Sequence, residues 1–343
     1  MNKTFPDPVI CSGSLPSKAF QITTYSLLMA SSLIGNFLIV GVFYRNKALR
    51  TTVHYFIMNM AISDLLYPVV YLPYRLSTKY FDDDGWLAQG VMGNVLCKLA
   101  LNAGMVSNSV STFNMMLIAV DRFHAVVSPM KPPIFSRSRC WLLIVFSWFV
   151  SVAFCSPLFY FVDHASDDNK LLRCDVNLRL LSQEMTLVTM ILTSCITVGI
   201  ALALTVLYSS IVVRLYRQNS QFNLATEQIQ RRAKKKRRIT WMLITVVILF
   251  YLVWIQVTAI NFSFYLKTDV TFPCIYAWLA YEVLLPLYPV VNPVLYYTFN
   301  ETYRQGFKDL LRCCCPRNVV PVQNTVRVNN TGQINYAIEL AQQ

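Results

Sequence analysis

Residues 185–213 read MTLVTMILTSCITVGIALALTVLYSSIVV and contain neither a charged residue nor a proline. A helix rises about 1.5 Å per residue, so about 20 apolar residues cross a hydrocarbon core roughly 30 Å thick. Lipid offers the backbone no hydrogen bonds, so a spanning segment must be a helix or part of a closed barrel. This stretch lacks the alternation of a barrel strand and is far longer than one. It is therefore predicted to be a transmembrane helix.

Six further stretches have the same character, and the seven together fill most of the chain. Only 14% of the residues are charged, whereas soluble domains carry about 25%. We therefore predict an all-α membrane protein, a seven-transmembrane helix bundle with a short amphipathic helix after it. The predicted spans are 22–43, 53–74, 91–120, 141–162, 185–215, 239–265 and 275–299. The predicted domains are an extracellular arm (1–21), the transmembrane domain (22–300), the amphipathic helix with a cysteine cluster (301–315) and a disordered cytoplasmic tail (316–343).

The net charge of +13 is distributed in a way that argues against nucleic acid as a partner. Basic residues gather at 45–50, 131–139 and 231–238, and acidic residues gather in the opposite connections, at 82–84 and 163–175. Basic loops stay on the cytoplasmic side, so we expect a multi-pass plasma membrane protein with its amino terminus outside. The basic run at 231–238 has two interpretations, which remain open: attraction to anionic membrane lipids or contact with a cytoplasmic partner.

Four cysteines lie on the predicted outer side, which is oxidising. A disulfide is predicted between Cys97 and Cys174, because both lie in a compartment that favours disulfides. Cys11 and Cys274 share that side and are predicted to form a second bridge.

Two kinds of covalent modification are also predicted. Cys313, Cys314 and Cys315 follow the amphipathic segment on the inner side, a position that suits palmitoylation; unmodified thiols are the alternative. Asn2 begins a glycosylation sequon with Thr4 on the outer side.

Asp64 lies in the middle of a predicted span, where a carboxylate costs about 2.5–3.5 kcal/mol. Such a group normally faces the bundle interior and has a partner. Asn36, Ser111 and Asn292 lie at matching depths in three other spans. Asp64, Ser111 and Asn292 could hold a sodium ion or a water network, and a purely structural hydrogen-bonded cluster fits the sequence equally well.

Two motifs end predicted helices on the inner side. Asp121-Arg122-Phe123 ends the third span, and Asn292-Pro293-Val294-Leu295-Tyr296 ends the seventh. Cys97 precedes Arg122 by 25 residues, and Pro129 follows it by seven. With these landmarks and with Asn36, Asp64, Trp148, Tyr208 and Trp254, residues 22–315 resemble the rhodopsin-like (class A) family of G-protein-coupled receptors.

The resemblance implies an activation switch in which the sixth span moves outward at its inner end. Arg122 would leave Asp121 and contact the carboxyl terminus of Gα, while Met130 would offer Gα an apolar contact. The residues implied in the switch and in the G-protein contact are Asp121, Arg122, Met130, Tyr208, Phe250, Trp254, Asn292, Pro293 and Tyr296. The chain has no nucleophile–base pair and no Gly-rich phosphate loop, so an enzyme is not expected. The tail carries only Thr325 and Thr331 as serine or threonine residues, so arrestin recruitment should be weak.

Three of the positions that depart from the family pattern bear on the switch. Ile200 and Gln256 stand where the fifth and sixth spans usually carry prolines. Lys236 stands where some relatives carry a glutamate that pairs with the arginine corresponding to Arg122, so this lock cannot form here.

The ligand class can be narrowed by exclusion. Pro286 occupies the position of the retinal-binding lysine and Gly104 that of the amine-binding aspartate, so neither an opsin nor an amine receptor is expected. Residues 50–56 and 118–123, with Trp86, look like those of neuropeptide receptors. A short extracellular peptide is the favoured ligand. A lipid or other small non-amine ligand is the alternative within the family, and a transporter or channel is a remote one.

The resemblance also implies a ligand pocket at the outer end of the bundle. Its predicted residues are Tyr74, Arg75, Leu101, Met105, Asn108, Thr193, Trp254, Val257, Thr258, Asn261, Tyr265, Trp278 and Glu282. Arg75 and Glu282 have two possible roles: they form an ion pair with each other, or Glu282 binds a ligand cation and Arg75 a ligand anion.

Overall fold

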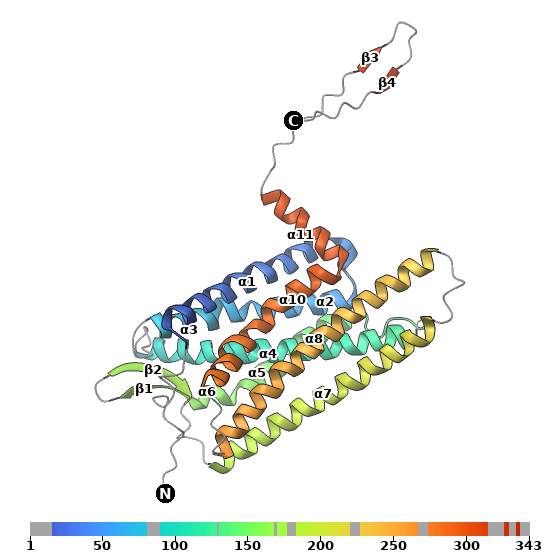
Figure 1. The fold of residues 1–343 in the computed structure, drawn as a ribbon. Helices are drawn as coiled ribbons and strands as arrows, with labels where there is room; N and C mark the ends of the chain where they lie inside the picture. Colours follow the sequence, from blue (N-terminus) through green and yellow to red (C-terminus); the bar gives the residue numbers. More distant parts are fainter. Residues whose placement is uncertain are drawn as a thin grey trace.

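The computed structural model describes residues 16–80, 90–128, 130–167, 170–176, 183–219, 227–266, 274–314, 326–328 and 334–336. Within these residues the predicted bundle is present, with one helix or a chain of consecutive helices in each predicted span (Figure 1). The helices are α1 (Lys18–Arg45), α2 (Thr52–Asp64) with α3 (Leu72–Tyr80), α4 (Gly90–Val127), α5 (Arg137–Cys155) with α6 (Pro157–Phe161), α7 (Gln183–Asn219), α8 (Glu227–Leu266) and α9 (Cys274–Trp278) with α10 (Leu285–Phe299). The amphipathic helix α11 (Glu301–Cys314) follows.

The apolar faces of these helices suit a lipid environment. Six helical segments within the described residues are long and apolar enough to cross a membrane, and α8 contributes a shorter apolar stretch, Val247–Ile260. On α7, Leu202 is 63% exposed and Val206 is 65% exposed. Large apolar side chains at this exposure on a helix of such length are explained by contact with lipid.

Three spans that the sequence predicts as continuous are interrupted, two of them at a proline. Pro68 lies in a π-helical turn, Tyr67–Tyr71, between α2 and α3, and a second π-helical turn, Leu279–Leu284, separates α9 from α10. Pro157 separates α5 from α6, so the helix predicted over 141–162 is broken after Cys155. A proline cannot donate to the carbonyl four residues earlier and its ring clashes with that carbonyl, which explains a break or bend at Pro68 and at Pro157.

Helix α11 packs against the inner end of α1. Tyr303 and Phe307 are buried on the face of α11 that meets the bundle. Gly306 lies between them, and a Cβ placed on it would be 2.5 Å from Cγ1 of Val42 on α1. Only a glycine permits this close approach, so the predicted amphipathic helix is anchored by shape as well as by burial.

A β-hairpin that the sequence analysis did not predict lies at the end of the bundle opposite α11 (Figure 1). Strands β1 (Val162–Asp167) and β2 (Lys170–Val176) pair antiparallel, with His164 opposite Cys174. Both strands contact α4, which carries Cys97, and Cys97 is disulfide-bonded. The side chain of Cys174 lies outside the described part of the structure, so its identity as the partner stays a prediction.

The tail departs from the prediction of disorder in one respect. Strands β3 (Val326–Val328) and β4 (Ile334–Tyr336) pair antiparallel. Other predicted features are not tested: Asn2, Cys11 and Cys315 lie outside the described residues, as do the side chains of Cys274, Cys313 and Cys314. The second disulfide, the glycosylation and the palmitoylation therefore stay predictions.

Candidate functional site

An ion pair joins α3 to the π-helical turn before α10, toward the outer end of the bundle. Arg75 donates from Nε to Oε2 of Glu282 at 3.0 Å and from Nη2 to Oε1. Tyr25 of α1 donates its hydroxyl to the same Oε2 at 2.8 Å. The side chains of Arg75 and Glu282 are only 20% and 14% exposed. Of the two roles left open for these residues, the structure shows the ion pair, and it adds Tyr25, which the sequence analysis missed.

Two tyrosines of the π-helical turn connect this region to α4. The ring centroids of Tyr67 and Tyr71 are 4.7 Å apart, and the centroid of Tyr71 lies 6.2 Å from that of Tyr74. A Cβ on Gly104 would be 3.3 Å from Tyr71 and 3.4 Å from Tyr67. A longer side chain at this position would displace the tyrosines, so the packing leaves no room for an amine-binding carboxylate.

A second group of predicted ligand residues lines a small cavity between α7 and α8. Its volume is ≈ 50 Å³, and its walls include the predicted residues Thr193, Trp254, Val257 and Thr258. A cavity of this size holds a few water molecules or the tip of one side chain. The sequence analysis missed the lining residues Met190, Ser194, Thr197 and Phe262. Three of these lie three or four positions from Thr193 or Thr258, so helical periodicity could have found them.

The other predicted pocket residues are spread over the outer half of the bundle. Tyr74 is buried in a cluster against which Leu101 packs. Trp278 is 8% exposed, and its ring centroid lies 6.1 Å from that of Phe20 on α1. The structure therefore brings some of the predicted residues together, around the Arg75–Glu282 pair and around the cavity, and places Trp278 against Phe20 instead.

Four further predicted residues complete this comparison. Asn108 is buried, whereas Met105 is 48% exposed. The side chains of Asn261 and Tyr265 lie outside the described part of the structure.

Asp64 is at the centre of the bundle and is 1% exposed. Ser111 donates to its Oδ1 at 2.6 Å, and Asn292 donates from Nδ2 to its Oδ2 at 2.9 Å. The hydroxyls of Ser63 and Ser111 lie 3.0 Å apart. The predicted grouping of Asp64 with Ser111 and Asn292 is thus present. Within the described residues, no group of three or more His, Cys, Asp and Glu side chains could hold a metal ion.

Asn36 has a different partner from the one its depth suggests. It donates from Nδ2 to the backbone carbonyl of Pro289 at 3.1 Å. In a regular helix this carbonyl would accept from the residue at position 293, but Pro293 has no N–H. Asn36 is buried and satisfies a carbonyl that the kink in α10 would otherwise leave unpaired.

At the inner end of α4, Arg122 pairs with its own neighbour. Arg122 donates from Nη2 to Oδ2 of Asp121 at 2.9 Å, and Thr52 of α2 donates to Oδ1 at 2.8 Å. Within the described residues, the buried Nε of Arg122 and the buried hydroxyl of Tyr208 have no hydrogen-bond partner. A buried polar atom without a partner costs about 1–3 kcal/mol, so both atoms would gain from a rearrangement that supplies one.

Helices α7 and α8 are joined below Trp254. The ring centroids of Phe250 and Trp254 lie 5.9 Å apart. Tyr251 donates its hydroxyl to the backbone carbonyl of Ala201, next to Ile200, where the family usually has a proline. This bond ties α8 to α7 at the level where the proline-assisted bend is absent.

Two predicted inner residues differ sharply in exposure. Tyr296 is 1% exposed, and its ring centroid lies 5.6 Å from that of Tyr303 on α11. Met130, between α4 and α5, is 96% exposed. Little of the described structure therefore covers this apolar side chain.

Comparison with known proteins gives a consistent result. The family model of the 7 transmembrane receptor (rhodopsin family) matches residues 35–296. The chain is 26% identical to a QRFP-like peptide receptor of Branchiostoma floridae, over 89% of this chain and 82% of that protein. It is 28% identical to neuropeptide FF receptor 2 of Mus musculus, over 86% and 73%. It is 27% identical to the RYamide receptor of Drosophila melanogaster, over 93% and 71%.

Proposed function

Because the chain belongs to the rhodopsin family of seven-transmembrane receptors, we propose that it binds an extracellular peptide and activates a heterotrimeric G protein. Members of this family are receptors and not enzymes. The similar proteins named as a QRFP-like peptide receptor and a neuropeptide FF receptor support a peptide as the ligand.

The observation that carries the peptide proposal is the ion pair between Arg75 and Glu282. The pair is largely buried, and separating a buried pair without replacement leaves charges that cost about 3–5 kcal/mol. A ligand that enters between them must therefore bring a cation for Glu282, an anion or carbonyl for Arg75, or both. Peptides carry such groups in their side chains and termini, whereas lipids such as fatty acids and sterols carry no cation.

Transmission to the G protein would use the unpaired atoms at the inner end. Outward movement of α8 would open a space below Arg122 and Tyr208, whose Nε and hydroxyl have no hydrogen-bond partner among the described residues. The Gα carboxyl terminus would fill this space and contact Arg122, while the exposed Met130 would add an apolar contact. The equilibrium between the closed and the open bundle shifts only by the difference in affinity that the ligand and the G protein have for the two states.

The oxygen atoms around Asp64 also fit a sodium ion. The hydroxyl of Ser111 lies within hydrogen-bond distance of the Asp64 carboxylate and of the Ser63 hydroxyl. Oxygen ligands suit hard cations. A bound ion would supply positive charge beside Asp64. Asn292 would then retain its bond to the carboxylate and keep α10 in place.

The test is activation of G proteins in cells that express the chain, with a pooled library of neuropeptides and, in parallel, a pool of lipids. The expected result is a response to a peptide that is lost with Arg122→Ala and weakened at least tenfold with Glu282→Gln. A response to lipids alone would replace the peptide proposal with the lipid alternative. Substrate uptake or ionic current without any G-protein response would contradict the receptor mechanism.

A further inference from the structure

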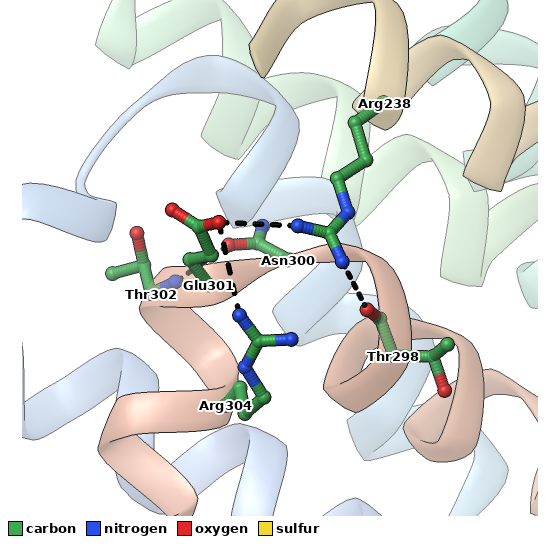
Figure 2. A network of polar contacts seen from close by, with 6 residues as sticks. All are labelled: Arg238, Thr298, Asn300, Glu301, Thr302 and Arg304. Atoms are coloured by element: carbon green, nitrogen blue, oxygen red, sulfur yellow. Dashed lines mark hydrogen bonds and ion pairs between the residues drawn. The ribbon is translucent and has the colours of Figure 1, made fainter. Parts of the chain in front are cut away.

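A polar cluster joins the inner end of α8 to the corner between α10 and α11 (Figure 2). Arg238 of α8 donates from Nη1 to Oε1 of Glu301 at 3.1 Å and from Nη2 to the backbone carbonyl of Thr298 at 3.2 Å. Arg304 approaches the same Oε1 of Glu301 at 3.7 Å from one turn further along α11. We call the contact of Arg238 with Glu301 and Thr298 the Arg238 clamp.

The shape of the corner explains why both acceptors are available. The last carbonyls of a helix have no donor within it, and Thr298 lies in the last turn of α10. A continuing helix would offer it the N–H of Thr302, but that N–H donates at 3.0 Å to the side chain of Asn300, between α10 and α11. Arg238 of α8 donates to the carbonyl of Thr298 instead.

The charges at the corner also favour this arrangement. The carboxyl end of a helix carries partial negative charge and its amino end partial positive charge. The guanidinium of Arg238 lies at the carboxyl end of α10. Glu301 is the first residue of α11, so its carboxylate lies at the amino end of that helix. The planar guanidinium of Arg238 donates to these two acceptors from two different nitrogen atoms, whereas a lysine has a single donor nitrogen.

The clamp connects α8 to the corner between α10 and α11. In some relatives, the corresponding helix is instead held by an ion pair with the arginine at the position of Arg122. Lys236 removes the lock between the sixth helix and Arg122, and Arg122 pairs instead with Asp121 of its own helix. The ion pair of Arg238 runs from α8 to α11.

We propose that Arg238 is a positioning residue that holds α8 inward in the unliganded receptor, and that ligand response requires its release from Glu301 and Thr298. This inference rests on the proposed G-protein function, because it assigns the closed state of that same switch. Arg238 and Glu301 are 42% and 59% exposed, so the clamp is weak enough to open. Exposed ion pairs contribute modestly, and loss of the clamp should raise the open population about two- to tenfold.

The experiment measures the position of α8 directly, without ligand or G protein. Spin labels are attached through introduced non-canonical residues at positions 234 and 138, so that native cysteines are not labelled. The distance between the labels is recorded in lipid nanodiscs, and nucleotide exchange on added G protein is measured in parallel. Arg237→Ala is the matched control, because it removes the neighbouring exposed arginine.

Arg238→Ala and Glu301→Gln should each lengthen the distance and raise ligand-independent exchange. The double variant should add little to Arg238→Ala, and Arg238→Lys should lie between Arg238→Ala and the unchanged chain. The exchange of charges, Arg238→Glu with Glu301→Arg, should restore part of the closed population, which a change that merely damages folding would not do.

The outcomes separate this inference from the proposed function. An unchanged distance in Arg238→Ala, or an equal change in Arg237→Ala, would overturn the clamp even if a peptide activates G protein. A lengthened distance in Arg238→Ala that Arg237→Ala does not reproduce would support the clamp, even if no G protein responds to any peptide.

Discussion

Asn36 supplies the hydrogen bond that Pro293 takes away from α10. The two residues lie on different helices: Pro293 of α10 has no N–H for the carbonyl of Pro289, and Asn36 of α1 donates to that carbonyl instead. A buried carbonyl without a donor is costly, so the kink in α10 depends on a side chain of α1. Arg238 performs the same task for the carbonyl of Thr298 at the end of α10.

Replacing Asn36 by Leu keeps the side chain's size but removes the donor. We expect the free energy of unfolding to fall by about 1–3 kcal/mol, because the carbonyl of Pro289 loses its partner. Thermal unfolding of the purified protein in detergent measures the loss.

The control for this prediction is Pro293→Ala, which returns an N–H to α10. In the Pro293→Ala background, Asn36→Leu should cost less than in the unchanged chain, since the carbonyl can be satisfied within its own helix. Equal costs in both backgrounds would mean that Asn36 does not act through Pro289.

The ion pair of Arg75 and Glu282 gives a second prediction for single residues. Arg75→Gln and Glu282→Gln should each destabilise the ligand-free protein by about 3 kcal/mol, because each leaves one largely buried charge without its partner. The double variant should recover much of this loss. Thermal unfolding of the three variants decides the point, and a double variant less stable than both single ones would argue against a mutual pair.

The depth of polar residues along each span could be predicted from the sequence, and their partners only in part. Ser111 and Asn292 do contact Asp64, as their matching depths predict. Asn36 lies at the same depth but faces Pro289, and Tyr25 reaches Glu282 from α1. The depth of a residue follows from the rise per residue. The direction in which its side chain points depends on how the helix is rotated about its axis, and packing with neighbouring helices sets this rotation.

Among the elements, length and apolarity predicted all seven spans, and local interruptions were missed. The π-helical turn Tyr67–Tyr71 contains Pro68 and the turn Leu279–Leu284 contains no proline. The sequence does not say whether a proline breaks, bends or bulges its helix. The hairpin of β1 and β2 was missed because its strands are rich in charged residues. Such strands depend on contacts with α4 more than on intrinsic preference.

The docking of α11 depends on the absence of a side chain at Gly306. Gly306→Ala should separate α11 from α1, because the added Cβ meets the short, branched side chain of Val42. Hydrogen exchange over 301–314 should become faster. Gly199→Ala is the matched control, since nothing lies within 4 Å of a Cβ there, and exchange on α7 should not increase. Slow exchange of α11 in Gly306→Ala would show that the contact is not needed.

For the whole molecule, the placement of charge sets the orientation. The basic run at 231–238 belongs to the same side as α11, and the acidic β1–β2 hairpin lies at the opposite end (Figure 1). Basic segments are retained in the cytoplasm, so the hairpin and the Arg75–Glu282 pair should face outward.

An epitope tag at the amino terminus should therefore bind antibody on intact cells. A tag at the carboxyl terminus should bind only after the membrane is permeabilised, and this second tag serves as the control for membrane integrity. Labelling of the carboxyl-terminal tag alone on intact cells would show that the orientation is the opposite one. The Arg75–Glu282 pair would then be out of reach of an extracellular ligand.

The most direct test of the account is nucleotide exchange by purified heterotrimeric G proteins, with the receptor in nanodiscs and the peptides that activate it in cells. We expect a peptide to accelerate exchange at least tenfold, and Arg122→Ala to abolish the acceleration while peptide binding remains. Peptide binding without any acceleration, across several types of Gα, would contradict the proposal that this chain activates G proteins.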